Sequence, residues 1–360
     1  MNSSPLLPLA LTLALALSTP AHGEGTKGEK DPTKPAAKSQ GKSKLQDYPN
    51  LGSIERVDPR LDALLPKEAR IEKLAEGFDW SEGPVWIKEG SYLVFSDVPQ
   101  NKIFKWSEGN PATVFLEPSG YTGSVPRGGE PGSNGLTVDA QGRLVMCEHG
   151  DRRVTRLERN GRKTTLARYY KFYRFNSPND LVFNSKGDLY FTDPPYGLLE
   201  KNADPAKELP FCGVYRLKPG DKEPTLIIRD LTFPNGIALS PDEKRLYVAV
   251  SDPDKPVITT FDVQPDGTVA NGQVFHDFTA QVKAGLKGLP DGMKVDRKGN
   301  LFATAPGGVY IFAPDGTHLG TLQTGQATAN CNWGNDGSVL YITADKFLCR
   351  VRTTTKGKGW

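Results

Sequence analysis

The amino-acid sequence predicts an all-β fold, a six-bladed β-propeller with four-stranded blades. Three observations carry this prediction. A unit of short β-forming segments recurs about every 40 to 55 residues, which is the period of propeller blades. Turns of the Gln-Gly, Lys-Gly and Asp-Gly type separate the segments, as in hairpins. No helical periodicity lies between the six matching copies, which favours a propeller over an open β-sandwich or two stacked domains.

Each copy of the unit begins with a short segment that opens on an acidic or amide residue, in most copies followed by glycine. The first strand of a propeller blade is the innermost one, so we expect these opening side chains to meet at one end of the central channel. The six opening residues are Glu82, Asn134, Asn179, Asn235, Asp291 and Asn332.

The rest of each copy supplies the outer strands of a blade. The second segment has the alternating side-chain pattern of a β-strand, as in residues 93–97. The third segment places a basic or polar residue among aromatic or β-branched ones, as in residues 214–217. A fourth strand follows in five copies, whereas the sixth copy ends in a tail rich in Thr, Lys and Gly. Residues 70–74, which precede the first copy, are therefore predicted to supply the missing strand and close the ring.

The N-terminal part of the chain differs from the repeats. Residues 6–17 form an apolar run too short to span a bilayer, and Ala21-His22-Gly23 suits signal peptidase, so residues 1–23 are predicted to be a signal peptide, with an uncleaved anchor as the alternative. Residues 24–47 carry six lysines and no aromatic residue, which predicts a disordered Lys-rich linker. The predicted hydrolase domain is residues 48–360. We expect an exported protein, periplasmic or secreted, without an integral membrane span after signal cleavage.

Composition narrows the classes of partner. The 45 Lys and Arg residues nearly balance 42 Asp and Glu residues, which argues against a nucleic-acid partner. Neither a nucleophile elbow, a zinc-protease helix, a phosphate-binding loop nor paired Cys-x-x-Cys motifs occur in the sequence. Oligomeric state is not indicated. Four cysteines leave both free buried thiols and three disulfide pairings open: Cys147, Cys212, Cys331 and Cys349.

The opening residues suggest a metal site at the axis. An Asn or Asp before Gly is commonly only a turn former. Here the same position recurs in every copy, so two carboxylates and several amide oxygens would converge from different blades. Such an all-oxygen set suits a hard cation, Ca²⁺, Mg²⁺ or Mn²⁺.

Several segments together resemble one family, the SMP-30, gluconolactonase and regucalcin family, and its bacterial gluconolactonase branch in particular. The resemblance covers nearly the whole chain after about residue 54. It implies a six-bladed propeller that hydrolyses sugar lactones with one divalent cation, Ca²⁺ first, with Mg²⁺, Mn²⁺ or Zn²⁺ as the other candidates. The segments that carry it are SEGPVW at 81–86, FSDVP at 95–99, SPNDL at 177–181, TDPPYG at 192–197, FPNGI at 233–237 and LPDGM at 289–293.

The resemblance also implies roles for individual residues. Glu82, Asn235 and Asp291 are expected to hold the metal, and Asn179 is expected either to join them or to contact substrate. With two carboxylates the site would be roughly neutral, and Asp291, then Glu82, is the expected acceptor of the proton from the attacking water. Besides Asn179, the positions and side-chain chemistry of four residues, and not the resemblance, suggest contacts with substrate: Asn134, His149, Arg174 and Tyr196.

Two other functions remain open from the sequence. The same metal and water chemistry would serve a metal-dependent phosphotriesterase or arylesterase. Alternatively the propeller binds a ligand without catalysis, since a fold alone does not decide function.

Overall fold

The computed structural model describes residues 47–360, so the predicted signal peptide and nearly all of the predicted linker lie outside the described residues. In this part the chain forms strands almost throughout. Its helices are short: η1 (Pro59–Ala63), η2 (Lys201–Ala203) and α1 (Thr279–Lys283). No helix among residues 47–360 has both the length and the apolarity that a membrane crossing requires.

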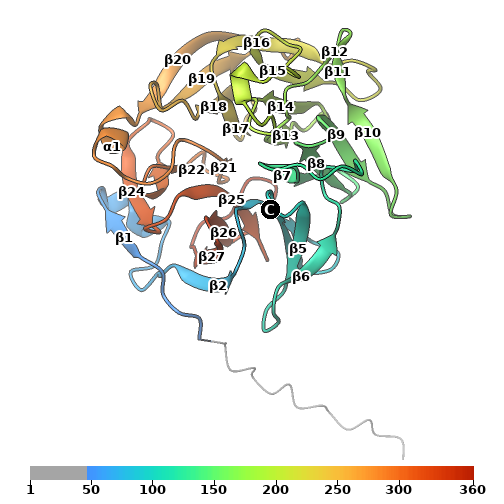
Figure 1. Cartoon of the computed structure of the whole chain (residues 1–360). Helices are drawn as coiled ribbons and strands as arrows, with labels where there is room; N and C mark the ends of the chain where they lie inside the picture. Colours follow the sequence, from blue (N-terminus) through green and yellow to red (C-terminus); the bar gives the residue numbers. More distant parts are fainter. Residues whose placement is uncertain (1–46) are drawn as a thin grey trace, which may run out of the picture. The chain divides into compact units, whose positions relative to one another are not determined.

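Six antiparallel sheets surround a central axis like the blades of a propeller, which confirms the predicted fold (Figure 1). From the axis outwards, blade 1 contains β3 (Ser81–Ile87), β4 (Tyr92–Asp97), β5 (Lys102–Trp106) and β6 (Thr113–Leu116). Blade 2 contains β7 (Ser133–Val138), β8 (Leu144–Glu148), β9 (Arg153–Leu157) and β10 (Lys163–Ala167). Blade 3 contains β13 (Leu181–Phe183), β14 (Leu189–Asp193), β15 (Cys212–Leu217) and β16 (Thr225–Leu231). Blade 4 contains β17 (Pro234–Leu239), β18 (Arg245–Val250), β19 (Val257–Val263) and β20 (Val269–Asp277). Blade 5 contains β21 (Met293–Val295), β22 (Leu301–Ala305), β23 (Gly308–Phe312) and β24 (His318–Gln323). Blade 6 contains β25 (Thr328–Gly334), β26 (Val339–Ala344) and β27 (Phe347–Arg352). A separate hairpin of β11 (Tyr169–Tyr170) and β12 (Tyr173–Arg174) joins blades 2 and 3.

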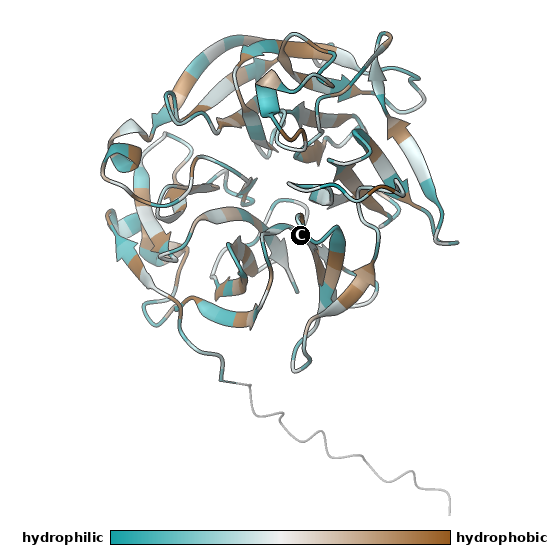
Figure 2. Ribbon diagram, in the orientation of Figure 1, coloured by the Kyte–Doolittle hydropathy of each residue, from teal (hydrophilic) through white to brown (hydrophobic). Residues whose placement is uncertain are grey.

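The hydrophobic core lies between neighbouring blades. Each blade has a neighbour on both faces, so second strands such as β8 and β22 are buried along their whole length. Between blades 2 and 3 the ring of Tyr215 lies 5.0 Å from that of Phe175 and 5.3 Å from that of Phe191. Outer strands such as β20 carry both hydrophilic and hydrophobic bands (Figure 2), because solvent borders them on one side.

Two N-terminal strands close the ring. β2 (Glu72–Glu76) pairs with β27, with Glu72 opposite Arg350, and completes blade 6. The predicted closing strand is confirmed, although it begins two residues later than the predicted residues 70–74. The sequence did not indicate β1 (Ser53–Arg56), which pairs with β24 and adds a fifth strand to blade 5.

The C-terminal tail, residues 353–360, crosses the base of the ring. Its backbone bonds to residues of blade 5, since Arg297 N donates to Lys356 O (2.9 Å) and Lys358 N donates to Val295 O (3.0 Å). Gly359 and Trp360 border a cavity formed by the last residues of the inner strands. The tail therefore lies at the end of the channel away from the residues that open those strands.

Arg350 is the buried charge at the closure. Its side chain is 1% exposed and forms ion pairs with Glu72 of the closing strand and with Glu108. The guanidinium also lies over the ring of Tyr48, 5.0 Å from its centroid. The ion pairs thus join the last strand of the chain to the closing strand and to Glu108, which lies between β5 and β6 of the first blade.

We predict that Arg350→Ala lowers the free energy of unfolding by about 3 kcal/mol, because it removes the buried partner of Glu72 and leaves that carboxylate only the more distant Arg70, at 3.8 Å. Chemical denaturation measures the effect. Arg352→Ala is the matched control, because Arg352 lies on the same strand with an exposed side chain. Equal stability losses for the two variants would contradict the prediction.

Candidate functional site

A cavity of about 350 Å³ lies at the end of the channel where the inner strands begin. Five of the six predicted opening residues border it, each from a different blade. They are Glu82, Asn134, Asn179, Asn235 and Asp291. Glu82, Asn134, Asn179 and Asn235 are at most 5% exposed, and Asp291 is partly buried. The propeller therefore brings together side chains that are far apart in the sequence.

Asn332 is the exception, and its predicted place beside the others is wrong. In β25 it is Asn330, opposite Thr343, that occupies the position of Glu82, which lies opposite Ser96 in β3. Asn332 lies two residues further along, donates to Pro84 O (2.8 Å) and borders the cavity at the other end of the channel. The sixth copy has no Asn-Gly pair to mark the correct position, so sequence reasoning chose the wrong asparagine.

The glycine that follows an opening residue is required by the close approach of adjacent inner strands. A Cβ at Gly236 would lie 2.1 Å from Asp291 O, and one at Gly83 would lie 2.4 Å from Asn134 O. Gly83 also has a φ of 49°. The Asn-Gly and Asp-Gly pairs therefore lie where adjacent inner strands are in close contact and are not simple turn signals.

Hydrogen bonds orient two of the opening side chains, one across neighbouring blades and one within a blade. Glu82 Oε2 accepts from Asn330 Nδ2 (3.3 Å), which reaches across the closure of the ring. Asn235 Nδ2 donates to Ser251 Oγ (2.9 Å), and this hydroxyl in turn donates to Pro290 O. With its nitrogen held by Ser251, Asn235 keeps its side-chain oxygen free.

Three buried oxygens in this cavity have no hydrogen-bond partner in the part of the chain described. They are Asn134 Oδ1, Asn235 Oδ1 and Asp291 Oδ1. Leaving buried acceptors without partners is costly unless a ligand satisfies them. Oxygens from amides and carboxylates are the donors that hard divalent cations prefer, so this set fits such an ion. Within residues 47–360 no three His, Cys, Asp or Glu side chains form a metal-binding group, so the amide oxygens would have to take part.

The site is more acidic than the sequence indicated. Asp180, which takes the place of a channel glycine, is 1% exposed and accepts from Leu181 N (2.8 Å). Burial raises the pKa of Glu82 to about 8, and the nearby charge of Asp180 contributes to the rise. Burial and then the charge of Glu82 raise the pKa of Asp291 well above its usual range. The expectation of a roughly neutral site therefore underestimates its negative charge, because one divalent cation would not balance every carboxylate around it.

The remaining predicted residues lie at different distances from the cavity. Tyr196 borders it, stacks on Phe233 and donates its hydroxyl to Ser251 O (3.2 Å). His149 is fully buried behind the wall, with Nε2 3.5 Å from Asn179 Nδ2. Arg174 lies on β12, where its backbone nitrogen donates to Glu208, and it does not border the cavity.

Sequence reasoning missed several residues of the wall. Glu130 borders the cavity and places Oε2 3.2 Å from His149 Nδ1. Trp80 and Leu289 add apolar surface, and Ser251 adds a hydroxyl. Glu130 lies in a loop between two blades that has no counterpart in the other copies, so no repeat pointed to it. Trp80 stands directly before the motif of residues 81–86, and Leu289 is the first residue of the motif of residues 289–293, so their places in the sequence were a usable signal.

Comparison with known proteins supplies the family. Residues 80–346 match the family model described as the SMP-30/Gluconolactonase/LRE-like region. The chain belongs to this family. A gluconolactonase from Zymomonas mobilis is 44% identical over 313 residues, which cover 85% of this chain and 88% of that protein. The lactonase drp35 of Staphylococcus epidermidis is 30% identical, covering 74% of each chain. The solved gluconolactonase of Xanthomonas campestris is 33% identical, with a TM-score of 0.73 over 86% of this chain and 99% of that one.

The raised pKa of Glu82 predicts how the cation-free protein responds to pH. The folded state keeps a proton on Glu82 that the unfolded state loses near its ordinary pKa of 4.5. The stability from this proton is complete below that value and is lost as the pH rises toward about 8. Thermal unfolding in excess chelator between about pH 5 and pH 9 measures this loss.

Glu82→Gln is the control for this titration, because it keeps the shape of the side chain and removes its proton equilibrium. The free energy of unfolding of wild type minus that of Glu82→Gln should fall as the pH rises. Saturating Ca²⁺ should remove this fall. A difference that is independent of pH in chelator would contradict the prediction.

Proposed function

We propose that this protein hydrolyses a sugar lactone to the corresponding aldonic acid and uses one divalent cation, Ca²⁺ as the first candidate. The observation that carries the proposal is the set of unpaired buried oxygens of Asn134, Asn235 and Asp291 in one cavity. Glu82, Asn235 and Asp291 would hold the cation, and Asn179 would either join them or contact the substrate. When bound, the cation would polarise the lactone carbonyl and make a water molecule more acidic.

The protein's own groups account for the proton movements. Asp291 is the proposed acceptor of the proton as water adds to the carbonyl carbon, with Glu82 as the second candidate. Ring opening breaks the bond between that carbon and the ring oxygen, which then takes up the proton, so no covalent intermediate with the protein is needed. Burial raises the pKa of Glu82 to about 8, which suits a group that exchanges a proton near neutral pH, and burial raises the pKa of Asp291 as well.

Relatives support the choice of substrate. A relative at 44% identity is a gluconolactonase, and a structurally similar protein from Xanthomonas campestris is one as well. The match covers 88% of the first protein and 99% of the second. The Lewis-acid chemistry would serve a phosphotriester or an aryl ester equally, and a binding propeller would need no chemistry, so substrates of each class belong in the test.

Export through residues 1–23 is part of the same proposal and rests on the sequence of this segment alone. N-terminal sequencing of the protein recovered from the periplasm and from the medium would locate the cleavage site and the compartment. An uncleaved chain that stays with the membrane fraction would contradict it.

The function is tested with cation-stripped and reconstituted protein on glucono-, xylono- and galactonolactone, a phosphotriester and an aryl ester. We expect the lactones to be hydrolysed only by the reconstituted protein, and Asp291→Ala to lower kcat/KM by about 10² to 10⁴-fold. Equal background rates for wild type and Asp291→Ala on every substrate would refute the enzyme. Loss of folding on cation removal, without any activity to lose, would favour a binding protein.

Ser251 is predicted to support cation binding through Asn235. Ser251→Ala frees the amide nitrogen of Asn235 and lets the side chain turn, so we expect the Ca²⁺ dissociation constant, measured by titration calorimetry, to rise by about 10-fold or more. Ser185→Ala is the control, because the hydroxyl of Ser185 donates to Glu243 at an exposed turn. Unchanged Ca²⁺ affinity in Ser251→Ala would show that Asn235 takes no part in binding the ion.

A further inference from the structure

Glu130 is a carboxylate in the cavity wall that the proposed reaction leaves without a role. It lies in the loop of residues 117–132, between β6 and β7, and its side chain is 34% exposed. It lines the same cavity as Glu82 and Asp291, so it stands near the groups to which the reaction is assigned. A carboxylate at this position adds repulsion to an acidic site, and this cost calls for a compensating contact.

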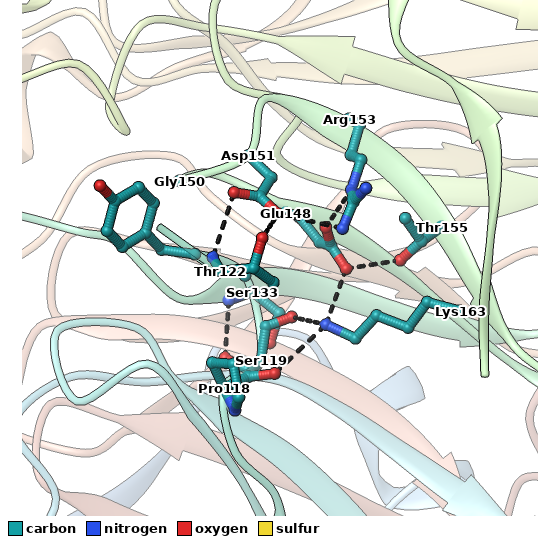
Figure 3. A network of polar contacts seen from close by, with 12 residues as sticks. Pro118, Ser119, Thr122, Ser133, Glu148, Gly150, Asp151, Arg153, Thr155 and Lys163 are labelled. Atoms are coloured by element: carbon teal, nitrogen blue, oxygen red, sulfur yellow. Dashed lines mark hydrogen bonds and ion pairs between the residues drawn. The ribbon is translucent and has the colours of Figure 1, made fainter. Parts of the chain in front are cut away.

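Buried ion pairs fix the beginning of this loop (Figure 3). Lys163 Nζ donates to Ser119 O (2.7 Å) and to Pro118 O (3.2 Å). The same ammonium lies 2.8 Å from the fully buried carboxylate of Glu148, which also accepts from Thr155 Oγ1 (2.8 Å). Because these groups are shielded from water and mutually paired, residues 118 and 119 are held firmly against blade 2.

The later part of the loop is bonded to the turn between β8 and β9. Thr122 donates to Asp151 through its backbone nitrogen (3.1 Å) and its hydroxyl (2.7 Å), as Figure 3 shows. Gly150 N donates to Pro131 O (3.1 Å), directly after Glu130. Arg127 donates to the backbone oxygen of Gly197 on the far side. Glu130 is thus fixed in the cavity wall from both directions.

The carboxylate of Glu130 keeps its hydrogen-bonding capacity. Its Oε2 lies 3.2 Å from His149 Nδ1, but the contact lacks hydrogen-bond geometry and Nδ1 has no partner among the described residues. No described group donates a hydrogen bond to Glu130. An ionised carboxylate accepts hydrogen bonds at two oxygens and donates none, so two neighbouring hydroxyl groups of a ligand would satisfy it.

We propose that Glu130 is a specificity-determining residue that selects polyhydroxylated lactones by accepting hydrogen bonds from hydroxyl groups on the lactone ring. This inference rests on the proposed function, because it assigns the substrate class of the same cavity. A lactone without hydroxyl groups leaves the carboxylate half-buried and unpaired, which disfavours its binding. Trp80 and Leu289 in the same wall offer apolar surface to the C–H groups of such a ring.

The test compares two substrates that share a ring and differ in hydroxyl groups, D-glucono-δ-lactone and δ-valerolactone. Glu130→Gln should lower kcat/KM for gluconolactone about tenfold or more, mainly through KM, and leave kcat/KM for δ-valerolactone unchanged or raised. Ca²⁺ affinity should stay that of wild type. Glu117→Gln is the matched control, because Glu117 lies in the same loop with an exposed side chain that pairs with Lys102.

Other outcomes overturn the inference in distinct ways. Equal losses on both lactones would place Glu130 at the reacting carbonyl, and weaker Ca²⁺ binding would make it a ligand of the ion. No change with either substrate would leave it a structural residue.

A failure of the proposed function is separable from a failure of this inference. Wild type that hydrolyses no lactone would refute the function. In that case calorimetric binding of gluconate and of 5-hydroxyvalerate decides the role of Glu130, since only gluconate should bind more weakly to Glu130→Gln. Equal affinities of wild type and variant for gluconate would then refute the role of Glu130 as well.

Discussion

The close approach of the inner strands at the head of the channel is the constraint on which the site depends. Adjacent inner strands come so near that a Cβ at Gly236 would lie within 2.1 Å of a neighbouring carbonyl oxygen. Glycine is therefore required directly after the opening residue, and the opening side chain is left to face the axis. Because this holds in several blades, a ring of acidic and amide side chains forms around one cavity.

Ring closure makes this ring of side chains continuous. Glu82 in the first blade and Asn330 in the last are 248 residues apart, and a 3.3 Å hydrogen bond joins them. This contact exists only because β2, from the N-terminal part of the chain, pairs with β27 and completes the last blade. The buried ion pairs of Arg350 with Glu72 and Glu108 hold the same junction. Stability of the ring and geometry of the site are thus properties of one junction.

The protonation of the carboxylates around the cavity depends on their burial more than on how many of them there are. Glu82 and Asp180 are shielded from water and Asp291 is partly buried, and burial raises the pKa values of Glu82 and Asp291. Carboxylates in such surroundings are stabilised by a cation or by a proton, and an enzyme of the proposed kind needs both at different moments. Glu130 adds a further charge at the wall, where hydroxyl groups of a substrate can reach it.

The sequence by itself determined the repeat, the number of blades, the closing strand near residues 70–74 and five of the residues that border the cavity, because period and register are local properties of the chain. Only the tertiary structure decided the features that depend on contacts between blades. It showed that Asn330 and not Asn332 holds the position of the opening residues and bonds to Glu82, that Asp180 adds a buried carboxylate, and that the loop carrying Glu130 reaches the wall. A loop without a repeat carries no positional signal, and its place is set by ion pairs and hydrogen bonds to segments distant in the sequence.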